Sequence, residues 1–430
     1  MTLPPDLPPR LKTFLNSLPS MEYYSDSTDE SASSIWNRLN PLQDQNGTTI
    51  IEPIDSDLYI KEFSISNASS TESPFPTQNA VDSGTLYVPF TNGMSLAYSR
   101  AVMAAEPTDK NLHNSDTVTM CYHAPHPLAP DQSETLESFT MTTIPDLPDE
   151  TALYETALYL SEGGHALEWV DSVKDILILD GPIFPVGLLA WHRGKPNLKN
   201  LLLENGPSRR ALKTYIDLID SFVKPTAAHS QQTPPLIGFV KNPRGSAIKS
   251  TFDHLPNETN SFVWGHDSSF FKQILSAHSP TKTQRGTKTH DSALVYTNWF
   301  ISKGRIASQF EEFLIDPFIG IMDHKNPLYD LTFFMIYDPR SGVVFRVESP
   351  YAFSQNPHIR QKIENFILKE MAIYNGPPRA INKADHLARM SNSEKVTLAK
   401  ILAAHYNTRI DVNYNFIRWS SSSMDQLQNL

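Results

Sequence analysis

The sequence predicts a mixed α/β protein, in which helices cover a β-sheet. Short apolar runs with few charges, which are typical of buried strands, recur between residues 79 and 350. Longer stretches with apolar residues at helical spacing lie between these runs, and this alternation indicates a sheet with helices on it. A chain of 430 residues that is 40% hydrophobic has enough apolar side chains for a large core.

The first strands are expected where the composition changes from polar to apolar, after residue 78. AVDSGTLYVPF at 80–90 predicts a strand, and SLAYSRAVMAAE at 95–106 fits either a helix or a strand. DTVTMCYHA at 116–124 predicts a further strand.

Two helix and strand pairs follow. Residues 149–171 and 207–224 have apolar side chains at helical spacing. DILILDGPIFP at 175–185 predicts a buried strand that stops at Gly-Pro, and PPLIGFVKNP at 234–243 predicts a second one. The order of strands, helix, strand, helix and strand supports the mixed sheet.

The last part of the fold begins with LTFFMIYDPRSGVVFRVESP at 331–350, which predicts two strands joined by a turn. On the second strand, Arg346 and Glu348 are expected to form an ion pair rather than a catalytic pair. Two helices are expected after it, at about 356–374 and 382–404.

The composition divides the chain into three parts. Residues 1–78 form a partly low-complexity N-terminal arm, with stretches rich in Pro, Ser and acidic residues. Residues 79–410 form the main domain, and residues 411–430 form a C-terminal tail. The arm contains TTIIEPIDSDLYIKEFSI at 48–65, which alternates like strands, so the arm could add a strand, dock elsewhere or remain a tail.

The charge of the chain limits how it could bind nucleic acid. A net charge of −11 argues against broad attraction to phosphates, so a DNA-binding site must be a local positive patch. Lys282, Arg285 and Lys288 lie in a Gly- and Thr-containing segment at 279–291 that reads as a loop. These three residues are our candidates for contacts with the DNA backbone, and a solvated linker is the ordinary alternative.

Several classes of protein are disfavoured by what the sequence lacks. A single cysteine, Cys121, leaves no disulfide and no paired thiols for a structural zinc site. There is no GxxxxGK[ST] loop for nucleotide hydrolysis and no GxSxG motif of a serine hydrolase. No long apolar segment and no apolar N-terminal leader are present, so a cytoplasmic location is expected.

Acidic residues at the ends of predicted strands and on predicted helices are the strongest chemical signal. Asp180 follows the apolar run ILIL directly, and Asp82 lies in the strand AVDSGT. Asp385 lies on a predicted helix near the C-terminus. Converging carboxylates bind hard divalent cations, which can promote phosphodiester hydrolysis. Each residue also has an ordinary interpretation as a turn-forming, capping or solvated acid.

A fourth acid is expected from the helix at 149–171. Glu155 and Glu162 lie seven residues apart on one face of that helix, so either could approach Asp180 if the helix runs back along the strand. Lys241, at the end of the strand LIGFVK, is the best candidate for a cation that grips a phosphate. A surface Lys that lies along apolar neighbours is its ordinary alternative.

These residues lie in segments that resemble the NurA family of nucleases, especially its longer haloarchaeal members. VDSGT with FTNGMSLAYSRAVMAA is similar to the first motif of the family, and YLSEGGHALEWVDSVKDILILDGPIFPVGLLAW to the helix and strand with the second and third acids. The further segments that occur in the order expected of the family are PPLIGFVKNPRGSAI, VYTNWF, FFMIYDPRSGVVFRVESPYAF and GPPRAINKADHLARMSNSEK.

The resemblance implies an RNase H-like fold and a homodimer that degrades DNA in double-strand-break repair beside the hexameric HerA translocase, an ATPase. It implies Mn²⁺ or Mg²⁺ as the cofactor, bound by Asp82, Glu162 and Asp180, with Glu155 as the alternative to Glu162. Lys241 would stabilise developing charge on the phosphate. Whether cleavage is exonucleolytic or endonucleolytic stays open.

Two positions depart from the family pattern. Many members have a Tyr and, eight residues later, a His in the last motif, where this chain has Pro377 and Asp385. A carboxylate can replace His as a ligand of manganese, so Asp385 keeps a metal site plausible. The alternatives are a catalytically inactive adaptor for the translocase and, less favoured, a glycosidase that uses paired carboxylates.

Overall fold

The protein is described here from a computed structural model. The described residues are 9, 12–14, 31–70, 72–108, 116–123, 134–136, 139–143, 150–188, 206–224, 233–255, 262–279, 282–284, 287–289, 293–303 and 326–411. No helix in these ranges is long and apolar enough to cross a membrane.

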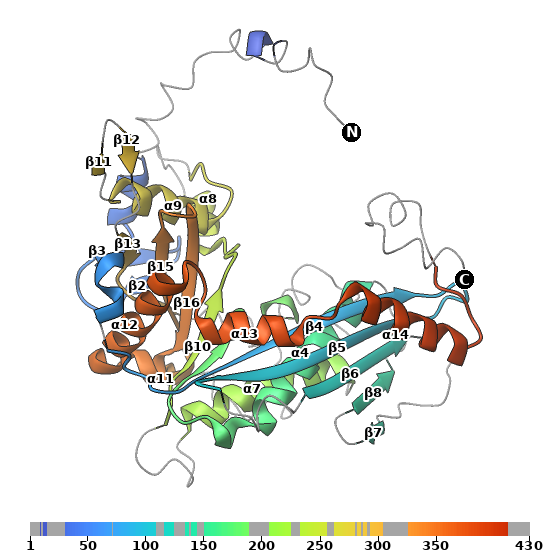
Figure 1. The fold of residues 1–430 in the computed structure, drawn as a ribbon. Coiled ribbons are helices and arrows are strands. Elements are labelled where there is room, and N and C mark those ends of the chain that lie inside the picture. Colours follow the sequence, from blue (N-terminus) through green and yellow to red (C-terminus); the bar gives the residue numbers. More distant parts are fainter. Residues whose placement is uncertain are drawn as a thin grey trace.

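The centre of the fold is a mixed sheet with strands in the order β6-β5-β4-β9-β10 (Figure 1). The strands β4, β5 and β6 form an antiparallel meander, β9 pairs parallel to β4, and β10 pairs parallel to β9. This is a mixed sheet in an α/β fold, as the sequence predicted, and the segment 95–106 is a strand. The bounds of these strands are Gln78–Pro89 (β4), Ser95–Glu106 (β5), Asp116–His123 (β6), Leu177–Leu179 (β9) and Leu236–Val240 (β10).

The sheet continues on both sides of this centre and has 14 strands among the described residues. Next to β10 it adds two antiparallel strands from the C-terminal half, and then short strands from residues 293–302 and 42–64. The N-terminal arm thus contributes strands to the main sheet, because β2 pairs with β14 and β3 pairs with β13. These strands are β1 (Leu42–Gln43), β2 (Thr49–Pro53), β3 (Ile60–Ser64), β13 (Ala293–Thr297), β14 (Phe300–Ser302), β15 (Leu331–Asp338) and β16 (Val343–Pro350), with β7 (Glu134–Leu136) and β8 (Phe139–Thr143) at the other edge.

Helices cover both faces of the sheet, because alternate residues of each strand point to opposite faces. Val81 and Leu179 pack with α4 and α7, whereas Ala80 and Ile178 pack with α12 and α13. A third cluster, on the face of β15 that carries Phe333, packs with α8 and α9. These helices are α4 (Glu150–Glu168), α7 (Pro207–Val223), α8 (Ala247–His254), α9 (Asp267–Ala277), α12 (Pro357–Tyr374) and α13 (Arg379–Ala388).

The helix expected at 382–404 is two helices. The first, α13, ends at Ala388, and α14 (Asn392–His405) begins after Ser391, which forms a capping box with Glu394. The signal for this start, a Ser followed three residues later by a Glu, is present in the sequence. Further short elements of the described chain are η1 (Ile65–Ser70), η2 (Val170–Ser172), η3 (Pro327–Tyr329) and α11 (Tyr351–Ser354).

A close contact fixes α13 against the sheet. A Cβ atom on Gly84 of β4 would lie 2.3 Å from the backbone oxygen of Ala388, which no side chain can tolerate. The glycine therefore allows the end of α13 to lie directly on β4. This contact sets the height of α13, and with it the position of Asp385, above the strand.

We expect Gly84→Ala to lower the free energy of unfolding by about 1–3 kcal/mol, because α13 must move away from β4. Gly164→Ala is the matched control, since a Cβ there meets nothing within 4 Å and alanine is favoured in a helix. Urea unfolding of both variants measures the difference. Equal stability of the two variants would contradict the close contact.

Candidate active site

The ends of two strands bring an Asp and a Lys together at one edge of the sheet. Asp180 follows β9 and Lys241 follows β10, and because these strands are parallel their C-terminal ends lie side by side. The Nζ atom of Lys241 lies 2.6 Å from Oδ2 of Asp180. The candidate phosphate-binding Lys therefore forms an ion pair with the candidate metal-binding Asp.

Asp82 lies next to this pair, on the neighbouring parallel strand. In β4 it has the same parity as Ala80 and Gly84, so its side chain points to the α13 face of the sheet. Its carboxyl group is hydrogen-bonded to that of Asp180. Two carboxyl groups in contact share a proton when no cation lies between them.

The electrostatics of the two carboxyl groups follow from this contact. Burial and the charge of Asp180 raise the pKa of Asp82 to about 7, although the N–H of Ser83 and the ammonium of Lys241 act in the opposite direction. Burial also raises the pKa of Asp180, and its hydrogen bond and ion pair with Lys241 oppose this effect. The site thus has an excess of negative charge that a single Lys does not balance.

Asp385 adds negative charge from α13. It contributes to the raised pKa of both Asp82 and Asp180 and therefore lies near them. Its side chain is 42% exposed and one oxygen lies 2.8 Å from the Arg389 guanidinium. Asp385 is thus an outer, solvent-accessible member of the group, and Pro377 precedes the helix that carries it.

Glu162 approaches from the opposite face of the sheet. Its carboxyl group accepts hydrogen bonds from the Tyr215 hydroxyl at 2.8 Å and the Ser83 hydroxyl at 3.2 Å. Burial and the charge of Asp82 raise the pKa of Glu162 to about 8. Ser83 follows Asp82 in β4 and points the other way, so it links Glu162 to the strand that carries Asp82.

The two Glu residues of α4 that were candidates, Glu155 and Glu162, have different surroundings. Glu155 lies two turns earlier, with its carboxyl group against Gly187 and Tyr159. The structure brings Glu162, rather than Glu155, close to Asp82. Sequence reasoning did not identify Ser83 and Tyr215. Ser83 could have been found, because it follows Asp82 in a predicted strand and its hydroxyl must therefore point to the opposite face of the sheet.

The four carboxyl groups lie in one region of the fold but do not converge on a single point. Among the described residues, no group of three or more His, Cys, Asp or Glu side chains has the arrangement of a metal site. Asp82 and Asp180 make direct contact, Asp385 is more exposed, and Glu162 is held on the other face by Tyr215.

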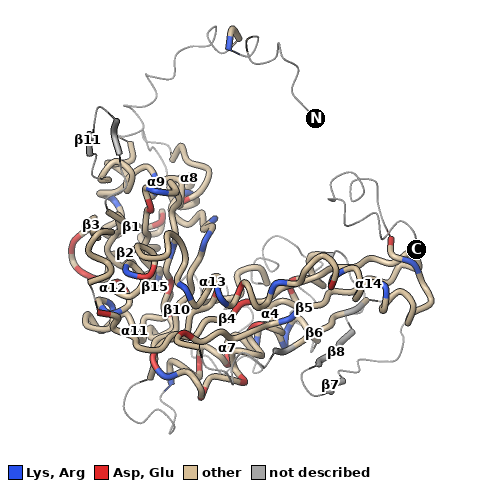
Figure 2. Tube along the Cα trace, in the orientation of Figure 1, with Lys and Arg blue, Asp and Glu red and all other residues tan. Residues whose placement is uncertain are grey.

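The other candidates lie elsewhere. Lys282 and Lys288 belong to a two-stranded hairpin, β11 (Lys282–Gln284) and β12 (Thr287–Thr289), where a loop was expected. Arg285 lies outside the described residues. Arg346 and Glu348 form the expected ion pair, with Nε 2.9 Å from Oε1. In Figure 2, acidic and basic residues are interspersed over the described part of the chain.

Residues 77–390 match the family model described as the NurA domain, which is more than two thirds of the chain. The chain belongs to the NurA family. The matched region contains Asp82, Glu162, Asp180, Lys241 and Asp385, so the whole candidate active site lies inside the NurA domain. No curated protein matches the chain.

NurA proteins are nucleases with a role in DNA repair, so this chain is assigned to the hydrolases that act on DNA. The NurA domain begins just before β4 and ends just after α13. Strands β1–β3 and helix α14 lie outside it, although they pack on the same sheet. They are additions to the NurA domain at its two ends.

We expect Tyr215→Phe to destabilise the fold by about 1–3 kcal/mol, because the buried Glu162 loses a hydrogen-bond donor. Tyr154→Phe is the matched control, since Tyr154 lies on α4 with 41% of its surface exposed. Chemical unfolding at neutral pH measures both changes. If Tyr215→Phe is as stable as Tyr154→Phe, the hydrogen bond does not hold Glu162 in place.

Proposed function

We propose that this NurA protein is a divalent-metal-dependent deoxyribonuclease that processes DNA ends in double-strand-break repair. The observation that supports this most strongly is the contact between Asp82 and Asp180, beside Lys241, at the C-terminal edge of parallel strands. Crowded carboxyl groups with raised pKa values are a donor set that Mn²⁺ or Mg²⁺ would fit, since these ions prefer oxygen ligands.

In this proposal the ligands are Asp82 and Asp180, with Asp385 and Glu162 as further carboxylates. When bound, the cation would neutralise charge on a phosphodiester and lower the pKa of water. Lys241 would donate a hydrogen bond to a phosphate oxygen after its ion pair with Asp180 is released. Tyr215 and Ser83 orient Glu162, so their hydroxyl groups act on its position rather than on the substrate.

The proposal also includes the partners. We infer that the protein acts as a homodimer in the cytoplasm with a hexameric ATPase of the HerA kind. The support is the family membership together with the lack of a P-loop in this chain, so that another protein must supply the work of moving DNA.

We expect purified protein to cleave labelled DNA with Mn²⁺, and Asp82→Asn and Asp180→Asn to lower the rate by about 100-fold or more. Asp217→Asn is the control, because Asp217 lies on α7 in an ion pair with Lys213 and leaves the site unchanged. Rates measured with Mn²⁺, Mg²⁺ and EDTA test the dependence on metal.

A second function, a non-catalytic adaptor for the translocase, is favoured by two observations. Pro377 stands where many NurA proteins have Tyr, and Asp385 is bound to Arg389. It predicts that the chain binds its motor protein and leaves DNA intact with every divalent ion. An inert wild type in the presence of the motor would therefore replace the nuclease proposal with this one.

The identity of the helix acid can be tested separately. We expect Glu162→Gln to weaken Mn²⁺ binding by about 10-fold or more, and Glu155→Gln to leave it unchanged, because Glu162 is the one near Asp82. Calorimetric titration with Mn²⁺ measures the affinity directly. The opposite order of the two variants would make Glu155 the ligand.

A further inference from the structure

A basic groove lies beside Lys241, outside the carboxylate group. It runs between residues 241–244, α9, and Gly342 with the first residues of β16. Arg244 and Lys272 line it and are both exposed, and neither has an ion-pair partner among the described residues. In a protein with a net charge of −11, two such cations next to a candidate phosphate-binding Lys form a local positive patch.

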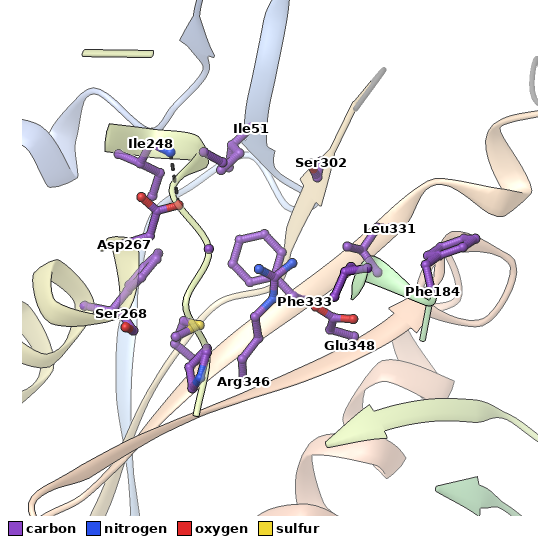
Figure 3. A pocket seen from close by; sticks show the side chains of 16 residues that line it. Ile51, Phe184, Ile248, Asp267, Ser268, Ser302, Leu331, Phe333, Arg346 and Glu348 are labelled. Atoms are coloured by element: carbon purple, nitrogen blue, oxygen red, sulfur yellow. Dashed lines mark hydrogen bonds and ion pairs between the residues drawn. The ribbon is translucent and has the colours of Figure 1, made fainter. Parts of the chain in front are cut away.

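An apolar hollow continues from this groove, and Pro243 and Ser268 line both. Its walls come from β15, β16, α8 and the start of α9, as Figure 3 shows. The apolar side chains that line it include Phe184, Ile248, Phe271, Leu331, Phe333 and Met335.

The charged groups of the hollow already have partners. Asp267 accepts hydrogen bonds from the N–H groups of Ile248 and Lys249 at the start of α8. Glu348 accepts one from the N–H of Ile183 and pairs with Arg346. The hollow therefore suits a flat, largely uncharged group better than a phosphate.

Arg346 provides a planar surface in this hollow. Its guanidinium lies over the ring of Phe333 at 4.1 Å, and Figure 3 shows it between Phe333 and Glu348. Guanidinium planes and apolar walls are surfaces on which unpaired bases stack. The N–H of Ile183, three residues after Asp180, donates a hydrogen bond to Glu348. Glu348 pairs with Gly238 and, through it, with Leu179, so the hollow lies on the face of the sheet from which Glu162 approaches, near the edge that carries Asp180 and Lys241.

We propose that the groove and the hollow hold one nucleotide of a single DNA strand beside the cleavage site. Arg244 and Lys272 bind its phosphate, and its unpaired base enters the hollow. A paired base cannot enter, so the subsite favours single-stranded DNA or frayed ends. This inference rests on the proposed nuclease function and specifies its strand preference.

The groove is tested by binding to a fluorescein-labelled single strand of about 20 nucleotides in EDTA, measured by anisotropy. Arg244→Gln with Lys272→Gln is expected to weaken binding about 10-fold and to reduce the salt dependence by about one phosphate contact or more. The charge-matched control is Lys395→Gln with Lys400→Gln on α14, at the far end of the molecule in Figure 1. If both double variants lose the same binding affinity, the groove is not the binding site for the phosphate.

The hollow is tested first on the wild type, so that the result does not depend on a variant's fold. A strand of abasic nucleotides keeps the phosphates and lacks the bases, and we expect it to bind about 10-fold more weakly. Gly245→Val then extends a side chain toward Arg346, since a Cβ at Gly245 lies 3.4 Å from its Nη1 atom. This variant is expected to lose the preference for the normal strand over the abasic one.

Equal affinity of the wild type for the two strands would overturn the base-binding hollow, as would an unchanged preference in a folded Gly245→Val protein. Thermal unfolding verifies the fold, and Gly245→Ala provides a smaller change. Hydrolysis of bis(p-nitrophenyl) phosphate by the wild type with Mn²⁺ reports the carboxylate site without DNA. Failure of that reaction, with normal strand binding, would contradict the nuclease proposal and leave the subsite standing.

Discussion

The site depends on the parallel pairing of β4, β9 and β10. Backbone hydrogen bonds between these strands fix which residues lie side by side, and the register pairs Val81 with Leu179 and Leu179 with Gly238. Asp82, Asp180 and Lys241 each come after these paired positions, so they reach one edge of the sheet together. Burial at this edge raises the pKa of both carboxyl groups, and the charge of Asp180 raises that of Asp82 further. The apolar residues that precede them, Val81 and Leu179, are fully buried and hold the strands in register despite this cost.

Much of the fold could be predicted because its signals are local. The apolar run before Asp180, the spacing of apolar residues in α7 and the turn between β15 and β16 each belong to a single short segment. The acids at the ends of such segments could be selected for the same reason.

The rest of the site could not be read from local patterns, because it depends on contacts between distant segments. Tyr215 is 53 residues from Glu162, and Tyr59 pairs with Asn298 across 239 residues of chain. Helix periodicity left Glu155 and Glu162 equivalent, and only the packing of α4 on β4 separates them. The break between α13 and α14 was missed because apolar residues lie on both sides of it, although Ser391 marks a new start.

The continuous sheet has a mechanical consequence for the two halves of the molecule. In Figure 1 the long strands β4 and β5 extend away from the compact half that contains β13–β16, and β9 and β10 lie where the halves meet. Within the described residues the halves are joined by the continuous ladder of β4, β9, β10 and β16, so bending one half against the other would break backbone hydrogen bonds in it. A load applied to one half is therefore transmitted through the strands that precede Asp180 and Lys241, and the edge that carries the candidate active site is a stiff corner rather than a hinge.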